Sequence, residues 1–523
     1  MSEVSTDQPE VQPSLARNAT VLSLGGVLSR GLGLVREIII PHYYGATGLV
    51  SAFAIAEFAV KTVYDLLVGG MLTAALVPVL SDYYRPEKRR EFAEVASVVL
   101  TVLSGLAALL VLVLELFAPF IVQLIGGGLN ATNQAAAVQL MRLVAPAVWM
   151  FANAGVLAAI LYSRQRFVMV ALGDALYNIG VIIAVPLLHQ RLGINALAVG
   201  ILMGSVIQVS FRLPELRGMG LHLSWRLRHP ALHRMLALYL PILASVAVGI
   251  FQAGVDRRLA SGTGESSLAY MRTATTLYQF PHGLVSVAIS VASLPTLSLW
   301  AASQDWIAYR RTLGAGLRAV LVLIVPATIG LWVLAEPVVR LIAQHGEFTA
   351  IDTYWTALVL RFYLPGLIFA SIDWPLNFSY YARNDSRTPA IVGVISVGAY
   401  LVVALSLLNT LSFLGLALAD AAKHAVHALI MAWLLYRWGG RLHQAVLRTA
   451  GQSLLAGALM GVVVYAIATV LLAQLGTQGL PARLLVVVVP AAAGGVLYYV
   501  LLRIMHVPET ALIDRLVGRL VRR

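Results

Sequence analysis

The chain contains no cysteine and few charged residues. None of its 523 residues is a cysteine, and Asp, Glu, Lys and Arg together make up 12% of the sequence. The absence of cysteine excludes a disulfide framework and a thiolate metal site. The hydrophobic content of 59% and the mean hydropathy of +0.83 exclude a soluble protein of this length. We therefore expect a polytopic membrane protein.

The sequence also lacks the motifs and the long loops of an enzyme. It contains no His-Glu-x-x-His and no Gly-x-Ser-x-Gly motif, and no Lys-Ser/Thr pair follows the glycines at 126–128 as a P-loop requires. The longest predicted loop, 212–231, is too short for a catalytic domain. We expect no catalytic residue, no metal and no enzymatic activity.

The positive charge predicts membrane orientation rather than nucleic-acid binding. The formal net charge is +13, but the Lys and Arg residues gather in short loops that follow every second apolar run. By the positive-inside rule these loops are cytoplasmic, so we expect both termini on the cytoplasmic side of a bacterial cytoplasmic membrane. Residues 1–18 are polar and contain proline, which predicts a disordered cytoplasmic tail.

Long apolar runs and short recurring motifs predict the architecture. About fourteen runs have the roughly 20 residues that a transmembrane helix needs. The recurring motifs, at offsets of about 217 and 219 residues, are 45–48 with 262–264, 77–81 with 294–298, and 161–164 with 380–383. We expect an all-α protein with two six-helix lobes in parallel orientation, and a substrate path between the lobes.

The repeat divides the chain at predicted loops. The N-lobe, with the first six spans, is expected at 19–228, and the C-lobe, with the next six, at 229–440. Residues 441–523 should form two extra C-terminal helices and a basic cytoplasmic tail.

Six charged residues interrupt the first two spans, where lipid would exclude them. They are Arg30, Arg36, Glu37, Glu57, Lys61 and Asp65. One central charge costs roughly 2.5 to 3.5 kcal/mol on a translocon scale, so these residues should line a protein interior or a wet cavity. Arg presents a planar fork to phosphate oxygens, whereas Lys presents a point charge. The two arginines therefore predict an anion-binding cavity.

The charges of the second span also have a structural interpretation. Glu57, Lys61 and Asp65 follow an i, i+4, i+8 spacing, which predicts one stripe of alternating charge. We interpret Glu57 and Asp65 as this polar stripe and keep Lys61 as a candidate substrate-binding residue. Arg36 and Glu37 fit either substrate binding or pairing across the helix bundle.

The second lobe carries three further candidates. Arg272, in the eighth span, fits substrate binding or pairing with Glu265, seven residues earlier. Asp256 and Asp420 fit either coupling to a monovalent cation or proton, or pairing with adjacent bases such as Lys423. No other cofactor is expected.

Several motifs resemble those of the MurJ (MviN) family, over about residues 15–440. The matching segments are 28–37, 44–46, 75–81, 260–261, 280–283 and 294–298. The resemblance implies a flippase for lipid II, the undecaprenyl-pyrophosphate-linked disaccharide peptide from which peptidoglycan is built. It implies alternating access through an arginine-lined cavity, with Arg30 and Arg36 matching the family's first-span arginines and Glu37 standing where the family usually has Asp. The last two spans would form a groove for the lipid tail.

Two positions depart from the family pattern. Tyr64 and Thr276 stand where the family commonly has Arg, and Lys61 and Arg272 lie about one helical turn from them. The expected partners are an anionic lipid-linked saccharide and membrane lipids, without nucleic acid, and a monomer is compatible with this role.

Three other functions stay open. The first two are a flippase for another undecaprenyl-linked oligosaccharide and a cation-coupled drug exporter of the same superfamily. The third is a non-transporting scaffold for envelope assembly. A drug exporter should favour acids over arginines in its first-lobe cavity, and a scaffold should tolerate neutral replacement of the arginines.

Overall fold

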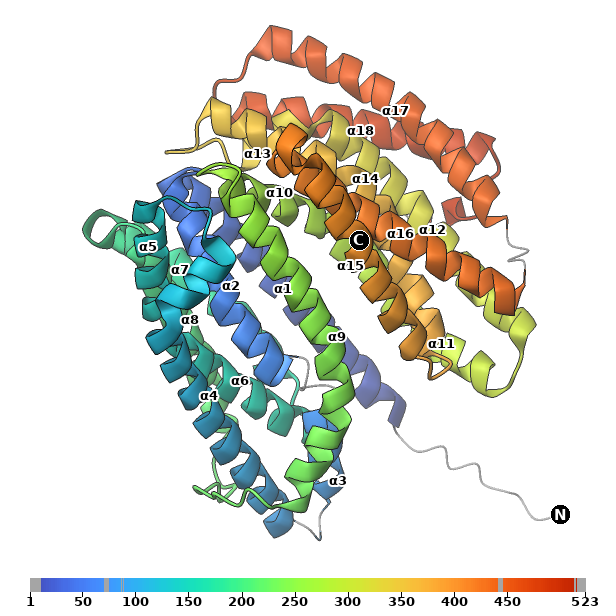
Figure 1. Cartoon of the computed structure of the whole chain (residues 1–523). Coiled ribbons are helices and arrows are strands. Elements are labelled where there is room, and N and C mark those ends of the chain that lie inside the picture. Colours follow the sequence, from blue (N-terminus) through green and yellow to red (C-terminus); the bar gives the residue numbers. More distant parts are fainter. Residues whose placement is uncertain are drawn as a thin grey trace, which may run out of the picture. The chain divides into compact units, whose positions relative to one another are not determined.

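Helices dominate the protein, and no strand occurs among the residues that the structure describes (Figure 1). This computed structural model describes residues 11–69, 75–85, 87, 89–440, 445–511 and 514. The chain divides into two compact units, unit 1 (Met1–Ser266) and unit 2 (Ser267–Arg523).

The helices of each unit follow in chain order. Those of unit 1 are α1 (Val11–Tyr44), α2 (Gly48–Tyr64), the π-helix η1 (Asp65–Gly69), α3 (Val77–Tyr83), α4 (Arg89–Gly126), α5 (Ala131–Val144), α6 (Pro146–Ser163), α7 (Val168–Leu192), α8 (Asn195–Arg212), the 3-10 helix η4 (Leu213–Leu216) and α9 (Pro230–Ser261). Those of unit 2 are α10 (Ser267–His282), the π-helix η5 (Gly283–Val287), α11 (Ala288–Ala302), α12 (Trp306–Val333), α13 (Ala335–Ile342), α14 (Ala350–Tyr381), α15 (Arg387–Leu411), α16 (Phe413–Gly439), α17 (Val446–Leu475) and α18 (Leu480–Ile504).

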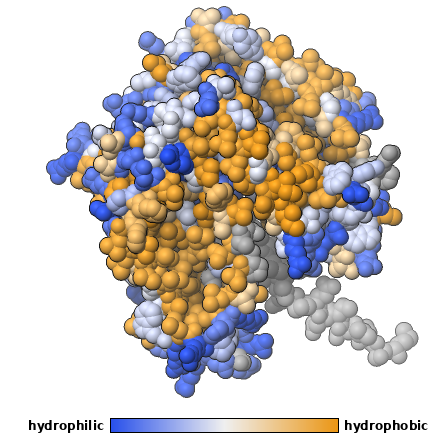
Figure 2. Space-filling view, viewed as in Figure 1, coloured by the Kyte–Doolittle hydropathy of each residue, from blue (hydrophilic) through white to orange (hydrophobic). Residues whose placement is uncertain are grey.

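The all-helical membrane architecture is confirmed. Within the described residues, 11 helical segments are long and apolar enough to cross a membrane. Helices α1, α2 and α9, which contain the charged candidates of the first, second and seventh predicted spans, are not among them, so the count of fourteen stays a prediction. Broad hydrophobic areas cover the visible face (Figure 2). On α4, Leu116 and Phe120 are 74% and 67% exposed, as expected of side chains that face lipid.

The beginning of the chain differs from the prediction. Helix α1 begins at Val11, so residues 11–18, predicted as part of a disordered tail, form its first turns. The apolar pattern that marks the span begins later, which is why the sequence placed the helix start near residue 19. Residues 1–10 and the basic tail at 515–523 lie outside the described residues.

The helices recur at the same offset as the sequence motifs. The π-helices η1 and η5 begin at Asp65 and Gly283, 218 residues apart. Helices α7 and α15 both have 25 residues and begin 219 residues apart, and each ends at an unusual backbone conformation. This conformation has φ 53° and ψ −137° at Gly193, and φ 55° and ψ −138° at Ser412. The repeat is therefore visible in local backbone detail.

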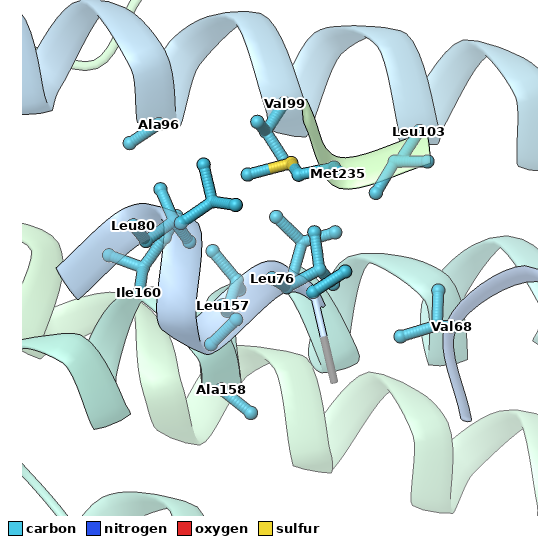
Figure 3. Close-up of a cluster of buried hydrophobic side chains, with 14 of the residues drawn as sticks. Val68, Leu76, Leu80, Ala96, Val99, Leu103, Leu157, Ala158, Ile160 and Met235 are labelled. Carbon is cyan, nitrogen blue, oxygen red and sulfur yellow. The ribbon is translucent and has the colours of Figure 1, made fainter. Parts of the chain in front are cut away.

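Helix α9 begins the second repeat but packs within unit 1. It ends at Ser261, as its counterpart α1 ends at Tyr44. Its Met235 is fully buried in the core of unit 1, where α3, α4 and α6 meet (Figure 3). The predicted lobe boundary at 228 and the boundary of the compact units therefore differ by this one helix.

Helices α7 and α8 pack with their backbones in close approach. A Cβ added to Gly180 would lie 2.2 Å from the backbone N of Gly204 and 2.3 Å from the carbonyl O of Gly200. Small residues permit such contacts in membrane proteins, where van der Waals packing holds helices together. This contact fixes the polar side chains of α7 and α8 relative to each other.

Candidate functional site

Arg36 lies on α1 in a partly buried, charge-compensated position. Its Nη2 lies 2.7 Å from the Oε1 of Glu37, and the two side chains are 18% and 13% exposed. The Arg36 guanidinium carbon also lies 5.8 Å from the ring centre of Tyr177 on α7. Arg36 and Glu37, which the sequence placed on neighbouring stripes of one helix, therefore form an ion pair against an aromatic ring.

A chain of aromatic rings connects Arg36 to Tyr64. The ring centres of Tyr177 and Phe151 are 5.3 Å apart, and those of Phe151 and Tyr64 are 5.7 Å apart, both in edge contacts. Tyr64 stands where the resemblance implies an arginine. The rings of Tyr177, Phe151 and Tyr64 therefore form a continuous row of aromatic contacts that begins beside Arg36.

Arg30 lies on α1 with an exposed side chain. The adjacent Ser29 donates to the carbonyl O of Asp174 at 3.3 Å, and Asn178 donates to the carbonyl O of Ser29 at 3.4 Å. These bonds attach α1 to α7 and place Arg30 on a helix that is held firmly by its neighbour.

Lys61 and Asp65 line a cavity of about 420 Å³ within unit 1. The Lys61 Nζ lies 2.8 Å from the Asp65 Oδ2, and the two side chains are 65% and 34% exposed. Helix α9 forms the other wall, where the Arg257 guanidinium carbon lies 4.1 Å from the ring centre of Phe58. Two cations and one carboxylate therefore line the cavity, which suits an anionic group.

The predicted stripe of Glu57, Lys61 and Asp65 changes helix type along its length. The α-helical part ends at Tyr64, and Asp65 is the first residue of η1. Glu57 is half-buried one turn before Lys61, and Asp256 is half-buried beside Arg257 on α9. Because π-helical turns often mark functional sites, the position of η1 beside this cavity supports a functional role for the cavity.

Sequence reasoning missed Arg212, which it placed at the edge of a loop. The residue is 1% exposed at the end of α8. Its Nη2 lies 2.5 Å from the Oδ1 of Asp174, and its Nη1 donates to the carbonyl O of Ala154 at 2.5 Å. Gln208 donates to the same Asp174 oxygen at 2.7 Å. The Arg212 guanidinium, which stays protonated, therefore connects α8 to α6 and α7 inside unit 1.

Arg272 lies on α10 in unit 2, half-buried. The hydroxyls of Thr275 and Thr276 donate to its carbonyl O at 2.9 Å and 3.1 Å. Glu265, its alternative partner in the sequence analysis, accepts a hydrogen bond from Asn130 in unit 1 at 2.5 Å. The Thr276 hydroxyl therefore forms a hydrogen bond within its own helix, α10.

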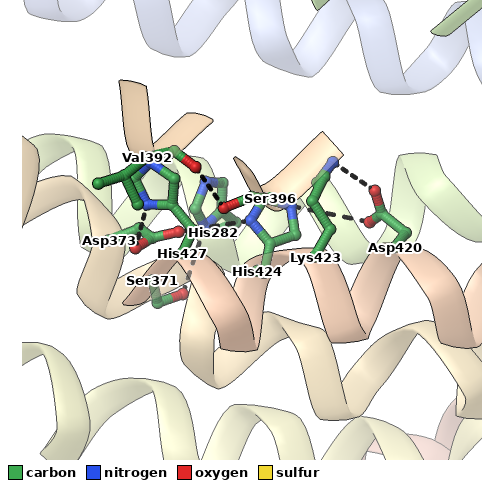
Figure 4. Close-up of polar contacts among 9 residues, drawn as sticks. All are labelled: His282, Ser371, Asp373, Val392, Ser396, Asp420, Lys423, His424 and His427. Atoms are coloured by element: carbon green, nitrogen blue, oxygen red, sulfur yellow. Dashed lines mark hydrogen bonds and ion pairs between the residues drawn. The ribbon is translucent and has the colours of Figure 1, made fainter. Parts of the chain in front are cut away.

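Asp420 belongs to a polar cluster inside unit 2 (Figure 4). Lys423 Nζ lies 2.6 Å from the Asp420 Oδ1, and His424 Nε2 lies 3.7 Å from the Oδ2. The Nδ1 of His424 faces Asp373 Oδ2 at 3.6 Å, while the Nδ1 of His427 lies 2.9 Å from Asp373 Oδ1. The cluster joins α16 to α14.

The histidines of this cluster could have been found in the sequence. Positions 420, 423, 424 and 427 follow the spacing of one helix face, and this face is polar within an otherwise apolar span. Only Asp420 and Lys423 of this face were considered as candidates from the sequence.

Together the structure and its charged interior define a multi-pass membrane protein of the transporter class. The chain belongs to the lipid II flippase MurJ family, whose profile matches residues 40–486.

Individual relatives agree with the family. A protein of Haemophilus influenzae described as "Probable lipid II flippase MurJ" is 29% identical over 79% of this chain and 83% of its own length. The "Lipid II flippase MurJ" of Burkholderia cenocepacia is 28% identical over 73% of this chain and 75% of its own length.

Solved structures share the fold. A structure titled "Lipid II flippase MurJ, inward closed conformation" has a TM-score of 0.79 and 22% identity, and the match covers 93% of this chain and 99% of that one. An inward-facing multidrug resistance MATE transporter of the MOP superfamily has a TM-score of 0.66 and 15% identity, over 80% and 95% of the two chains.

Proposed function

We propose that this protein translocates lipid II across the bacterial cytoplasmic membrane. The observation that carries the proposal is the family match over residues 40–486, on a chain whose first helix holds a partly buried arginine. Neither rival transport function nor the scaffold function gains support from the comparisons.

The cationic residues of unit 1 suit the pyrophosphate of this substrate. Arg36 offers a planar fork of N–H donors, and Glu37 and Tyr177 hold that fork in place. Lys61 and Arg257 add two cations at the cavity beside η1. We assign pyrophosphate binding to Arg30, Arg36, Lys61 and Arg257, and we keep Arg272 as a further binding residue.

The remaining parts of the molecule suit a lipid substrate. Helices α17 and α18 follow the repeat and pack on each other, and they expose apolar side chains such as Val462 (68%) and Val496 (65%). We propose that they accept the polyprenyl tail, that both termini are cytoplasmic, and that one chain suffices for transport by alternating access.

Complementation tests the proposal in a cell. A bacterium depleted of its own lipid II flippase should grow when it expresses this chain, and growth should be lost with Arg36→Ala. Arg217→Ala, on an exposed residue outside the site, is the control, with membrane levels compared by immunoblot. Failure of the well-inserted wild-type chain to restore growth would contradict lipid II as the substrate.

A further inference from the structure

Unit 2 contains a cluster of titratable side chains whose charges do not balance. It comprises the carboxylates of Asp373 and Asp420, the ammonium of Lys423 and the imidazoles of His424 and His427. With both imidazoles neutral, the cluster has a net charge of −1. Uncompensated charge inside a membrane protein is costly, so the cluster favours one additional positive charge.

Among the described residues, the basic groups within ion-pair distance of Asp373 and Asp420 are Lys423, His424 and His427, so surrounding helices place no further cation on the two carboxylates. Helix α10 contributes His282, whose Nδ1 lies 3.2 Å from the hydroxyl of Ser371, and Tyr278, whose ring stacks on His282 with centres 6.2 Å apart. The other titratable residues of the helices that pack on α14 and α16 are Tyr270 and Arg272 of α10, Arg387 and Tyr400 of α15, Tyr309, Arg310, Arg311 and Arg318 of α12, and Glu336 and Arg340 of α13. Of these, Arg318 pairs with Glu509 and Arg340 pairs with Glu336.

His424 is placed to accept the missing charge. Its Nδ1 faces Asp373 at 3.6 Å and its Nε2 faces Asp420 at 3.7 Å. A neutral imidazole has one N–H donor, whereas an imidazolium donates from both ring nitrogens. Only the protonated form of His424 therefore presents an N–H to each carboxylate and can form an ion pair with both.

The geometry favours a proton over a metal cation. Both oxygens of Asp373 face imidazole nitrogens, and Asp420 is engaged by Lys423. A hard monovalent cation would need these oxygens and would have to displace the bases. Histidine, by contrast, changes charge between pH 5 and 8.

We propose that His424 binds and releases the proton that couples transport to the transmembrane proton gradient, bridging Asp373 and Asp420 when it is protonated. This inference rests on the transport function proposed above. The proton enters from water on one side of the membrane, stays on the imidazole while the bridge joins α14 to α16, and returns to water on the other side. Release leaves two carboxylates with one ammonium and weakens the bridge, so protonation shifts the balance between conformations.

The test uses the full chain in proteoliposomes that contain fluorescent lipid II in sodium-free potassium buffer. Each unit of pH gradient can bias a one-proton cycle by about tenfold at most. A gradient of about two units can therefore bias the cycle by up to about 100-fold, so the wild-type flipping rate should change on the order of tenfold or more, and His424→Gln should lose this response. His424→Asn is a second neutral replacement if the glutamine variant does not fold.

Two control variants test whether His424 is the residue that binds the proton. His427→Gln keeps an N–H donor near Asp373, as the Gln208 amide, 219 residues earlier, donates to a different carboxylate in unit 1, so the gradient response should remain. His233→Gln changes an exposed histidine on α9 and should also leave the response unchanged. A gradient response that survives in His424→Gln, or one that is lost only in His427→Gln, would overturn the assignment. A response to a sodium gradient with none to pH would overturn it in favour of a metal cation.

A second measurement separates this proposal from the function on which it rests. Nitrogen NMR of histidine-labelled wild-type chain in lipid nanodiscs should show both the protonated and the neutral imidazole of His424 as the pH is varied, with the resonance assigned by its loss in His424→Gln. An imidazole that stays neutral throughout would overturn the proton site. If His424 titrates and lipid II does not move, the proton site stands and the proposed substrate is wrong.

Discussion

The two units use corresponding positions, 208 and 427, to hold a carboxylate that is half-exposed in unit 1 and buried in unit 2, and the holding groups differ in chemistry. In unit 1, the amide of Gln208 and the guanidinium of Arg212 hold Asp174, and neither group loses its donors near neutral pH. In unit 2, His427 stands 219 residues after Gln208 and holds Asp373, with His424 beside it. The comparison indicates that unit 1 holds its carboxylate with an amide and a guanidinium, whereas unit 2 holds its carboxylate with imidazoles.

This difference suggests a division of roles between the repeats. Unit 1 contains the arginine of α1 and the cavity of Lys61 and Arg257, where fixed positive charge suits an anionic headgroup. Unit 2 contains the cluster to which we assign proton binding. Replacing residues of one unit with those at the corresponding positions of the other tests the comparison directly.

The largest effect is expected from Arg212→Met, which installs the residue of unit 2 at the corresponding position, Met431. The change removes a buried guanidinium and leaves the carbonyl of Ala154 without its donor. Breaking such a buried pair typically costs about 3 kcal/mol or more, although the half-exposed Asp174 reduces the penalty. Thermal unfolding in detergent should show a clear loss of stability, and Arg217→Met should show none. An unchanged unfolding temperature would mean that this charge does not hold unit 1 together.

A smaller loss of stability is expected from Gly180→Ala. Unit 2 has Ala399 at the corresponding position, but in unit 1 a Cβ at Gly180 would lie 2.2 Å from backbone of α8, which cannot turn away. Overpacking of this kind costs about 1 to 3 kcal/mol. Thermal unfolding provides the measurement, with Gly398→Ala as the control because no atom lies within 4 Å of a Cβ there. Equal unfolding temperatures for both variants would contradict the close approach of α7 and α8.

A gain in stability is expected from Ser412→Gly. Ser412 and Gly193 share a backbone conformation at φ 55° and 53° that glycine adopts more readily. Removal of the side chain should stabilise unit 2 by about 1 kcal/mol, and Gly193→Ser should destabilise unit 1 by a similar amount. Chemical denaturation of the two variants measures both effects. If both variants changed the free energy of unfolding in the same direction, the turns at Gly193 and Ser412 would not be equivalent.

The smallest effect on stability is expected from Lys61→Gln, which installs the residue of unit 2 at the corresponding position, Gln279. The exposed Lys61–Asp65 pair should contribute about 1 kcal/mol or less to folding. If Lys61 binds the headgroup, the apparent affinity for lipid II should fall about three- to tenfold, and the difference should shrink at high salt. Binding titrations at two salt concentrations measure this. An unchanged affinity would assign Lys61 to the polar stripe alone.

The fold class and the repeat could be predicted from the sequence, but several interior contacts could not. Long apolar runs indicate segments that face lipid, and recurring motifs indicate a duplication. Both patterns are pronounced in this chain. The burial of Arg212 could not be predicted because Arg212 stands at the end of a predicted span, and its partners come from α6 and α7. The π-helices were also not predicted, because their turns depend on packing rather than on composition.

The candidate site was predicted in part. The sequence indicated Arg36 and Glu37 as interior charges, and the structure joins them in one ion pair beside Tyr177. Arg257 was not among the candidates from the sequence, since its position over Phe58 depends on how α9 packs on α2. The roles of these residues in transport stay predictions.

Flipping of fluorescent lipid II by the purified chain in proteoliposomes, without any ion gradient, tests the central claim most directly. The wild-type chain should move the labelled headgroup between leaflets faster than protein-free vesicles. Arg36→Ala should lose about 10- to 100-fold of that rate, because a charge-assisted hydrogen bond to the pyrophosphate contributes about 1.5 to 3 kcal/mol. A wild-type rate equal to that of empty vesicles, or an Arg36→Ala rate equal to the wild-type rate, would contradict the account.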